Sequence, residues 1–160
     1  MAQLERFQRR IHEVIPVARH MEVRLEDYNG RQLLVSAPLA PNHNHQGTGF
    51  GGSIYSVAVV AAWGLAELVL EDWQLTGQVV VQQGAIDYSE PVTGDFYAIG
   101  ELPDEAGVAR FRKSLARHGK GRITIRTQVY CGHPRLATDD RPVATLEGRF
   151  VVQDAGPLVR

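Results

Sequence analysis

The residues best suited to chemistry form a short polar segment that is rich in glycine. From Asn42 to Ser53 the sequence reads NHNHQGTGFGGS, and a long apolar segment follows it directly. Glycines let a ligand approach the backbone, and the amides of a helix's first turn carry partial positive charge, so this junction suits the polarisation of an acyl carbonyl. The imidazoles of His43 and His45 titrate near neutral pH and are candidate general bases. The plainer alternative is that the glycines only turn the chain and that both histidines are exposed.

The apolar segment that follows predicts the element that positions this loop. From Ser53 to about Leu70, apolar residues cover every side of a helix, which is typical of a core helix wrapped by a sheet. Its strongly apolar part, Val57–Ala66, covers only about half of the roughly 20 residues that a membrane span requires. We therefore expect a buried helix and no membrane span.

Two further helices and six strands are predicted around this core helix. Leu4 to Ile15 has helical spacing of apolar residues and ends at Pro16, and Ala106–His118 is a basic helix. Asn29-Gly30 is a hairpin signal in which both turn residues take positive φ. The predicted strands are Met21–Glu26, Gln32–Ala37, Gly77–Ile86, Phe96–Glu101, Arg122–Tyr130 and Ala144–Val152.

These elements predict an α+β fold in which an antiparallel sheet of about six strands wraps around one long buried helix. The sheet is expected to be antiparallel because the links between strands are of hairpin length. A single sheet of this kind leaves its edges and one face poorly covered. We therefore expect a dimer that extends or covers the sheet.

Composition excludes several classes of protein. The 160 residues carry 17 Lys and Arg against 18 Asp and Glu, a formal net charge of −1. This balance indicates neither a nucleic-acid nor a membrane partner. A single cysteine rules out an internal disulfide framework and a cysteine-rich metal site. Residues 1–15 lack the apolar core of a secretory signal, and no linker or repeat is present. We expect one domain over residues 1–160, a cytoplasmic location and no bound metal.

The loop and helix together resemble a known family. The pattern Asn44-x-x-Gly47-x-x-x-Gly51-Gly52 before an apolar helix is similar to the loop–helix element of hotdog-fold acyl-thioesterases. More closely, APLAPNHNHQGTGFGGSIYSVAVVAAWGL resembles the YiiD C-terminal type of thioesterase domain, in the 4-hydroxybenzoyl-CoA and phenylacetyl-CoA thioesterase-like superfamily. The segments 86–95 and 119–130 agree with it, so the resemblance covers nearly the whole chain. It implies a hotdog fold, a sheet wrapped around one long helix.

The resemblance also implies a function. It implies an acyl thioester hydrolase that acts on acyl-CoA or on an acyl carrier protein, as a homodimer that can pair into a dimer of dimers. No cofactor is implied beyond the coenzyme A or phosphopantetheine that the substrate carries. Gly51 and Gly52 would hold the carbonyl, and Asn44 and His45 would hold and activate water. The expected substrate-binding residues are Phe50, Ser53, Tyr55, Ser56, Val59, Gln83, Arg117, His118 and Lys120.

Two positions depart from the phenylacetyl-CoA type. That type often has a histidine where this chain has Phe50, and a helix carboxylate where it has Val59. The base must then come from elsewhere, and His45 is the adjacent candidate. The missing carboxylate leaves open a non-catalytic acyl-CoA-binding or sensing domain. It counts against a 3-hydroxyacyl thioester dehydratase, which needs a histidine together with a helix carboxylate.

Other polar groups are weaker candidates. Gln82 and Gln83 interrupt an apolar strand, where an unpaired buried amide costs about 1–3 kcal/mol, so we expect them at a dimer interface or facing the substrate. Cys131 has no adjacent histidine and is given no nucleophilic role. A basic run would attract the phosphates of coenzyme A or an acidic carrier protein, unless it is only a solvated helix face. This run comprises Arg110, Arg112, Lys113, Arg117, His118, Lys120 and Arg122.

Overall fold

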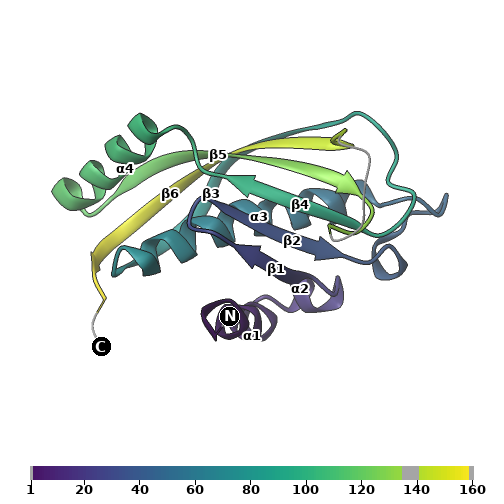
Figure 1. The fold of residues 1–160 in the computed structure, drawn as a ribbon, viewed down its shortest axis with the longest axis horizontal. Coiled ribbons are helices and arrows are strands. Elements are labelled where there is room, and N and C mark those ends of the chain that lie inside the picture. Colours follow the sequence, from purple (N-terminus) through teal and green to yellow (C-terminus); the bar gives the residue numbers. More distant parts are fainter. Residues whose placement is uncertain (1, 135–140, 159–160) are drawn as a thin grey trace.

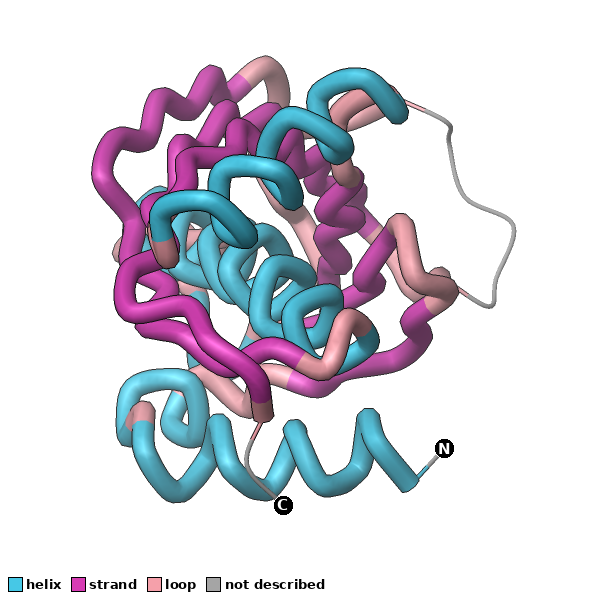
Figure 2. Tube along the Cα trace, turned by 90° about the vertical axis from the view of Figure 1, so that its left-hand side faces the viewer, coloured by secondary structure: helices cyan, strands magenta, loops and turns pink. Residues whose placement is uncertain are grey.

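One curved antiparallel sheet and one long helix organise the molecule (Figures 1 and 2). The computed structural model describes residues 2–134 and 141–158. The strands follow the order β1-β2-β4-β5-β6-β3 across the sheet, and each neighbouring pair is antiparallel. In chain order the elements are α1 (Ala2–Val14), α2 (Pro16–His20), β1 (Arg24–Tyr28), β2 (Gln32–Ala37), the short 3-10 helix η1 (Ala40–Asn42), α3 (Gly51–Asp72), β3 (Leu75–Tyr88), β4 (Phe96–Glu101), α4 (Glu105–His118), β5 (Gly121–Cys131) and β6 (Ala144–Pro157).

Helix α3 is the centre of the hydrophobic core. Its Leu65 and Leu68 are fully buried, as are Ile125 and Phe150 on the inner face of the sheet, the face toward α3. At Gly100 of β4, an added Cβ atom would lie 2.9 Å from a backbone carbonyl oxygen of α3. Only glycine therefore lets β4 and α3 pack this closely. The predicted α+β architecture, a sheet around a long buried helix, is confirmed.

The same helix is long and apolar enough to cross a membrane by length and composition alone. However, 72% of its most apolar window is buried inside the fold. A span would present that surface to lipid, whereas here strands and α1 cover it. The prediction of a core helix for this segment is confirmed.

Two amphipathic helices close the ends of this core. Phe7 of α1 stacks on Trp63 of α3, with ring centroids 5.7 Å apart. Phe111 of α4 contacts Trp73, just beyond the end of α3, with centroids 6.0 Å apart. Figure 2 shows α4 lying across one end of the curved sheet and α1 running below it.

The first hairpin differs from its prediction in two respects. The strand predicted at 21–26 begins later, at Arg24, because the short helix α2 continues the chain after Pro16 and Glu22 turns it with a φ of 54°. In the turn, only Gly30 has positive φ. Asn29 acts instead through its side-chain oxygen, which accepts hydrogen bonds from the backbone of Arg31 (2.9 Å) and Gln32 (2.8 Å).

Strands β3 and β4 follow one another in the chain but are not neighbours in the sheet. β3 pairs with β6 at one edge, whereas β4 lies between β2 and β5. The connecting segment 89–95 passes beside the loop before α3, where the Gly49 amide donates to the Val92 carbonyl (2.7 Å). Val92 is 1% exposed, so this contact belongs to the core. Because β3 pairs only with β6 among the described strands, its other edge is free, and the strand ends close to the glycine-rich loop.

Candidate active site

The loop before α3 is held in place from within. Asn42 is 1% exposed, and its side-chain amide donates to the carbonyls of Met21 (2.9 Å) and Pro38 (2.8 Å). The backbone carbonyl of Asn42 accepts a hydrogen bond from the Phe50 amide (2.7 Å), and this bond closes the loop at the start of α3. The sequence does not indicate this role for Asn42, because nothing in the local pattern shows that this asparagine is buried.

At the start of α3, the glycine pair forms the first turn of the helix. Phe50 is the N-cap residue, and no side chain of the described residues caps the helix. The amides of Gly51, Gly52 and Ser53 are therefore first-turn donors without an intrahelical partner, at the positive end of the helix dipole. Gly52 is exposed and Gly51 half-buried. This end of α3 can bind a partial negative charge such as a polarised carbonyl oxygen.

Tyr88, which the sequence did not indicate as a site residue, borders this position. Its hydroxyl donates to the Gly51 carbonyl (2.8 Å) and so ties the end of β3 to the start of α3. Burial, and secondarily Tyr55, raise the pKa of Tyr88 above its ordinary value. The phenol therefore stays protonated at neutral pH and remains a donor.

The two residues predicted to handle water lie in the turn between positions 44 and 48. The side-chain oxygen of Asn44 accepts from the backbone of Gln46 (2.8 Å) and Thr48 (3.1 Å), and its amide donates to the Thr48 hydroxyl (2.8 Å). One amide N–H of Asn44 is left for a ligand. His45 is exposed and has no hydrogen-bond partner among the described residues. The roles of both residues in catalysis stay predictions.

Three half-buried side chains of α3 lie one helical turn apart, in the order Tyr55, Val59, Trp63. The Tyr55 hydroxyl occupies the space above Gly84 of β3, where an added Cβ would lie 2.1 Å away. Trp63 donates from its indole to the Val79 carbonyl of β3 (3.0 Å). These contacts place an apolar wall between α3 and β3, with Val59 in its middle.

The remaining predicted binding residues do not gather at the start of α3. The register of β3 against β6 shifts between Val81 and Gln83, so Gln82 is an extra residue at a bulge. Gln83 pairs with Arg149, and both Gln82 and Gln83 are exposed. In this chain the two amides are thus solvated, not buried.

The basic run likewise does not form one surface. Arg112 lies over the Trp73 ring, 5.0 Å from its centroid, as a cation–π contact. Arg117 and His118 are exposed in the last turn of α4. Lys120 and Arg122 instead line a hollow beside β5 and β6.

Comparison with known proteins identifies the family of this fold and loop. The model of the YiiD_C family, described as "Putative thioesterase (yiiD_Cterm)", matches residues 4–154. The chain belongs to this family. The resemblance inferred from the loop–helix residues is thereby confirmed, and the fold is the hotdog that it implied.

Solved structures of similar proteins agree with this assignment. A protein of unknown function from Chlorobaculum tepidum is 30% identical, with a TM-score of 0.85 and 93% of each chain covered. A "putative thioesterase" from Shewanella oneidensis is 29% identical, with a TM-score of 0.79, covering 96% of this chain and 99% of that one. A Haemophilus influenzae thioesterase shares the fold at 13% identity and a TM-score of 0.69, covering 98% of this chain and 92% of that one.

Proposed function

We propose that this member of the YiiD_C family hydrolyses acyl thioesters of coenzyme A or of an acyl carrier protein. The observation that carries the proposal is the uncapped first turn of α3. There the backbone amides of Gly51 and Gly52 have no capping side chain among the described residues, and the turn is partly exposed. A thioester carbonyl bound there gains charge stabilisation as its oxygen becomes negative. One good donor of this kind is worth about 2.7–4 kcal/mol in other enzymes.

In the proposed reaction, water attacks the thioester carbon while the carbonyl oxygen rests on the Gly51 and Gly52 amides. The free N–H of Asn44 orients the water, and His45 takes its proton. The tetrahedral intermediate then expels the thiolate, which receives that proton from His45. The products are a carboxylic acid and a thiol, and no covalent enzyme intermediate forms.

The acyl chain is proposed to lie against the wall formed by Tyr55, Val59 and Trp63, which offers apolar surface next to the carbonyl position. Phe50 is 55% exposed and flanks the entrance. Ser53 is buried in the first turn, and Ser56 donates its hydroxyl to the Gly52 carbonyl (2.8 Å). These two serines are proposed to border the ligand.

We propose that the working form is a homodimer joined through β3. This strand is an edge of the sheet, and its residues from Val80 to Ala85 are exposed. Val80, Val81 and Tyr88 are respectively 51%, 47% and 50% exposed, unusually high for large apolar side chains on a strand. Antiparallel pairing with the same strand of a second copy would satisfy this edge. A dimer of dimers and a cytoplasmic location stay predictions.

Val59 favours one alternative function. It stands where the phenylacetyl-CoA type carries a carboxylate, and the first acid of α3 is Glu67, near the far end. A domain that binds acyl-CoA without hydrolysing it needs no such carboxylate. This sensing function shares the proposed binding site and differs only in turnover.

Thiol release separates the two functions. Purified protein is incubated with a panel of short-chain, long-chain and aryl acyl-CoAs, and with an acyl carrier protein substrate. We expect turnover that peaks at one acyl length. His45→Ala should lower kcat by about 10²–10⁴ if the imidazole is the general base.

His20→Ala is the matched control, because His20 is also exposed but lies on α2. A loss of only a few-fold in His45→Ala would remove the proposed base. A rise in Tm with acyl-CoA but no thiol release would support the sensing function instead.

A further inference from the structure

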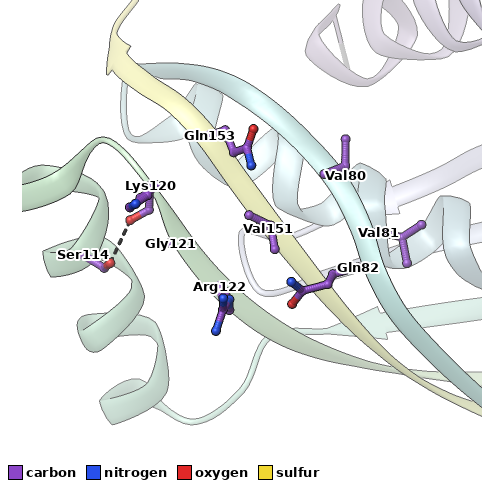
Figure 3. Close-up of a pocket in the computed structure, with 9 residues that line it drawn as sticks. All are labelled: Val80, Val81, Gln82, Ser114, Lys120, Gly121, Arg122, Val151 and Gln153. Carbon is purple, nitrogen blue, oxygen red and sulfur yellow. Dashed lines mark hydrogen bonds between the residues drawn. The ribbon is translucent and has the colours of Figure 1, made fainter.

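A hollow on the outer face of the sheet, the face away from α3, lies apart from the start of α3. It has a volume of about 660 Å³, within the range of small-molecule sites. Figure 3 shows its lining on α4, β5, β6 and β3, with α3 behind the strands. The lining residues are Val80, Val81, Gln82, Ser114, Lys120, Gly121, Arg122, Val151 and Gln153.

The sheet register explains how these side chains meet. Arg122 of β5 is directly opposite Val151 of β6, which is directly opposite Val80 of β3. Directly opposite residues share a face of a sheet. One row across three strands therefore carries a guanidinium at one end and two valines beside it.

The charge of the hollow is entirely positive. Lys120 and Arg122 are the charged residues of its lining, and neither side chain has an ion pair or hydrogen bond among the described residues. Three other hollows of the described chain contain acids as well as bases, such as Glu67 and Glu71 beside the arginines of α1. Two unpaired cations on one wall favour an anionic ligand.

A second hollow, of about 290 Å³, continues the first along α4. The two share Ser114 and Arg122, and the second adds Arg110 and again contains no acid. Arg122 thus stands between two cationic hollows. A ligand with more than one phosphate group fits this arrangement better than a single anion does.

The turn that carries Lys120 is rigidly held. Gly119 ends α4 in the left-handed conformation, with a φ of 63°. The Ser114 hydroxyl donates to the Lys120 carbonyl (2.7 Å), and the Ala155 amide donates to the Gly119 carbonyl (2.8 Å). The backbone position from which Lys120 extends is therefore set by the fold before any ligand arrives.

The uncharged part of the hollow suits a flat ring. Val80 and Val151 form an apolar surface, and the amides of Gln82 and Gln153 stand on either side of it in Figure 3. A purine can stack on the valines and exchange hydrogen bonds with the amides. Apolar surface, amides and two cations together match a phosphorylated purine nucleotide.

We propose that this hollow binds the phosphorylated adenosine end of coenzyme A, and that Arg122 and Lys120 hold its phosphates. The proposal rests on the proposed thioesterase function and narrows its substrates to acyl-CoA over acyl carrier protein. Strand β3 links the two places, since Val80–Gln82 line the hollow and Tyr88 contacts Gly51. In the proposed dimer, antiparallel pairing of the two β3 edges would bring the hollow of one copy toward the start of α3 in the second copy.

Binding of free coenzyme A tests the site without turnover. Isothermal titration compares the wild-type protein with Arg122→Gln, Lys120→Gln and a control, Arg126→Gln. Arg126 lies on the same strand and face, directly opposite Glu147 of β6 in the sheet register, and lines neither hollow. We expect Arg122→Gln to weaken coenzyme A binding about 10-fold or more, as for a lost charge-assisted hydrogen bond, and Arg126→Gln to change it little.

Kinetics then separate this proposal from the proposed function. Arg122→Gln should raise KM for an acyl-CoA at unchanged kcat, and should leave the hydrolysis of an acyl-pantetheine, which lacks the nucleotide, unchanged. Turnover of acyl-CoA with the same KM in wild type and Arg122→Gln would overturn the nucleotide site but keep the hydrolase. Arg122-dependent coenzyme A binding without turnover would keep the site and overturn the hydrolase.

Two further results would overturn the assignment to coenzyme A. One is the absence of coenzyme A binding by the wild-type protein. The other is equal affinity for ATP and coenzyme A, because a free nucleotide would then be an equally good ligand. Thermal unfolding of each variant confirms that the exposed substitutions leave the fold intact.

Discussion

Asn44 shows that a single side chain can serve both the shape of a loop and its chemistry. Its side-chain oxygen accepts hydrogen bonds from two backbone amides of the turn. Its amide nitrogen donates one of its two N–H groups to the Thr48 hydroxyl. A residue used in this way tolerates few replacements. The two roles can nevertheless be separated, because one depends on the oxygen and the other on the free N–H.

We expect Asn44→Ala to destabilise the protein by about 1 kcal/mol or more, since two loop amides lose their acceptor. Asn44→Asp keeps the acceptor and should unfold near the wild-type urea midpoint, with Thr48 donating in place of the lost amide. It should still lose thioesterase activity, because it cannot donate to water. Wild-type activity in Asn44→Asp would limit Asn44 to shaping the loop.

At the scale of elements, α1 and α3 meet through a mixed apolar and charged contact. Phe7 stacks on Trp63, while Arg10 lies 3.5 Å from Glu67. Burial raises the pKa of Glu67, and Arg10 lowers it by less. The folded protein therefore binds the Glu67 proton more tightly than the unfolded chain does.

A raised pKa makes the contribution of Glu67 to stability depend on pH. That contribution is fully present below the ordinary glutamate pKa of about 4.3 and is lost as pH rises through the raised value. Glu67→Gln removes the buried charge, so it should have a higher Tm than wild type at pH 7 and no advantage near pH 4. The measurement is thermal unfolding at both pH values.

Glu71→Gln is the control for this change, because it removes only an exposed contact between Glu71 and Arg6 and should alter Tm little. A lower Tm for Glu67→Gln at pH 7 would contradict the prediction. It would mean that the Arg10 contact contributes more than burial costs.

At the scale of the whole molecule, β3 is an edge strand that exposes large apolar side chains. We expect Val81→Lys to convert the proposed dimer to a monomer, because antiparallel pairing would bury two added charges at the edge. Light scattering after size exclusion measures the change in mass. Activity should fall with the dimer, since the proposed substrate spans both copies.

Val14→Lys is the matched control for this substitution. Val14 is 60% exposed, even more than Val81 at 47%, and it is the last residue of α1, not part of the sheet. The same change of residue there should leave the mass unchanged. An unchanged dimer in Val81→Lys would exclude the β3 edge as the interface.

Much of the secondary structure could be predicted because its signals are local. Strands Gln32–Ala37 and Phe96–Glu101 lie where the sequence predicts them, and the helix apolar on every side is the core helix. Side-chain periodicity depends only on near neighbours in the chain, so it can be recognised without knowing the fold. The glycine-rich loop at the start of that helix was recognised from its Gly, Asn and Pro content, and the family from the resemblance of the loop and helix residues.

The sequence by itself thus determined most of the elements, the core helix and the loop that begins it. Only the tertiary structure decided that β3 pairs with β6 at the edge of the sheet and not with β4, because strand pairing depends on residues far apart in the chain. It also decided that Gln82 forms a bulge and that Arg122, Val151 and Val80 share one row. Those three residues come from three strands, and only the register brings them together.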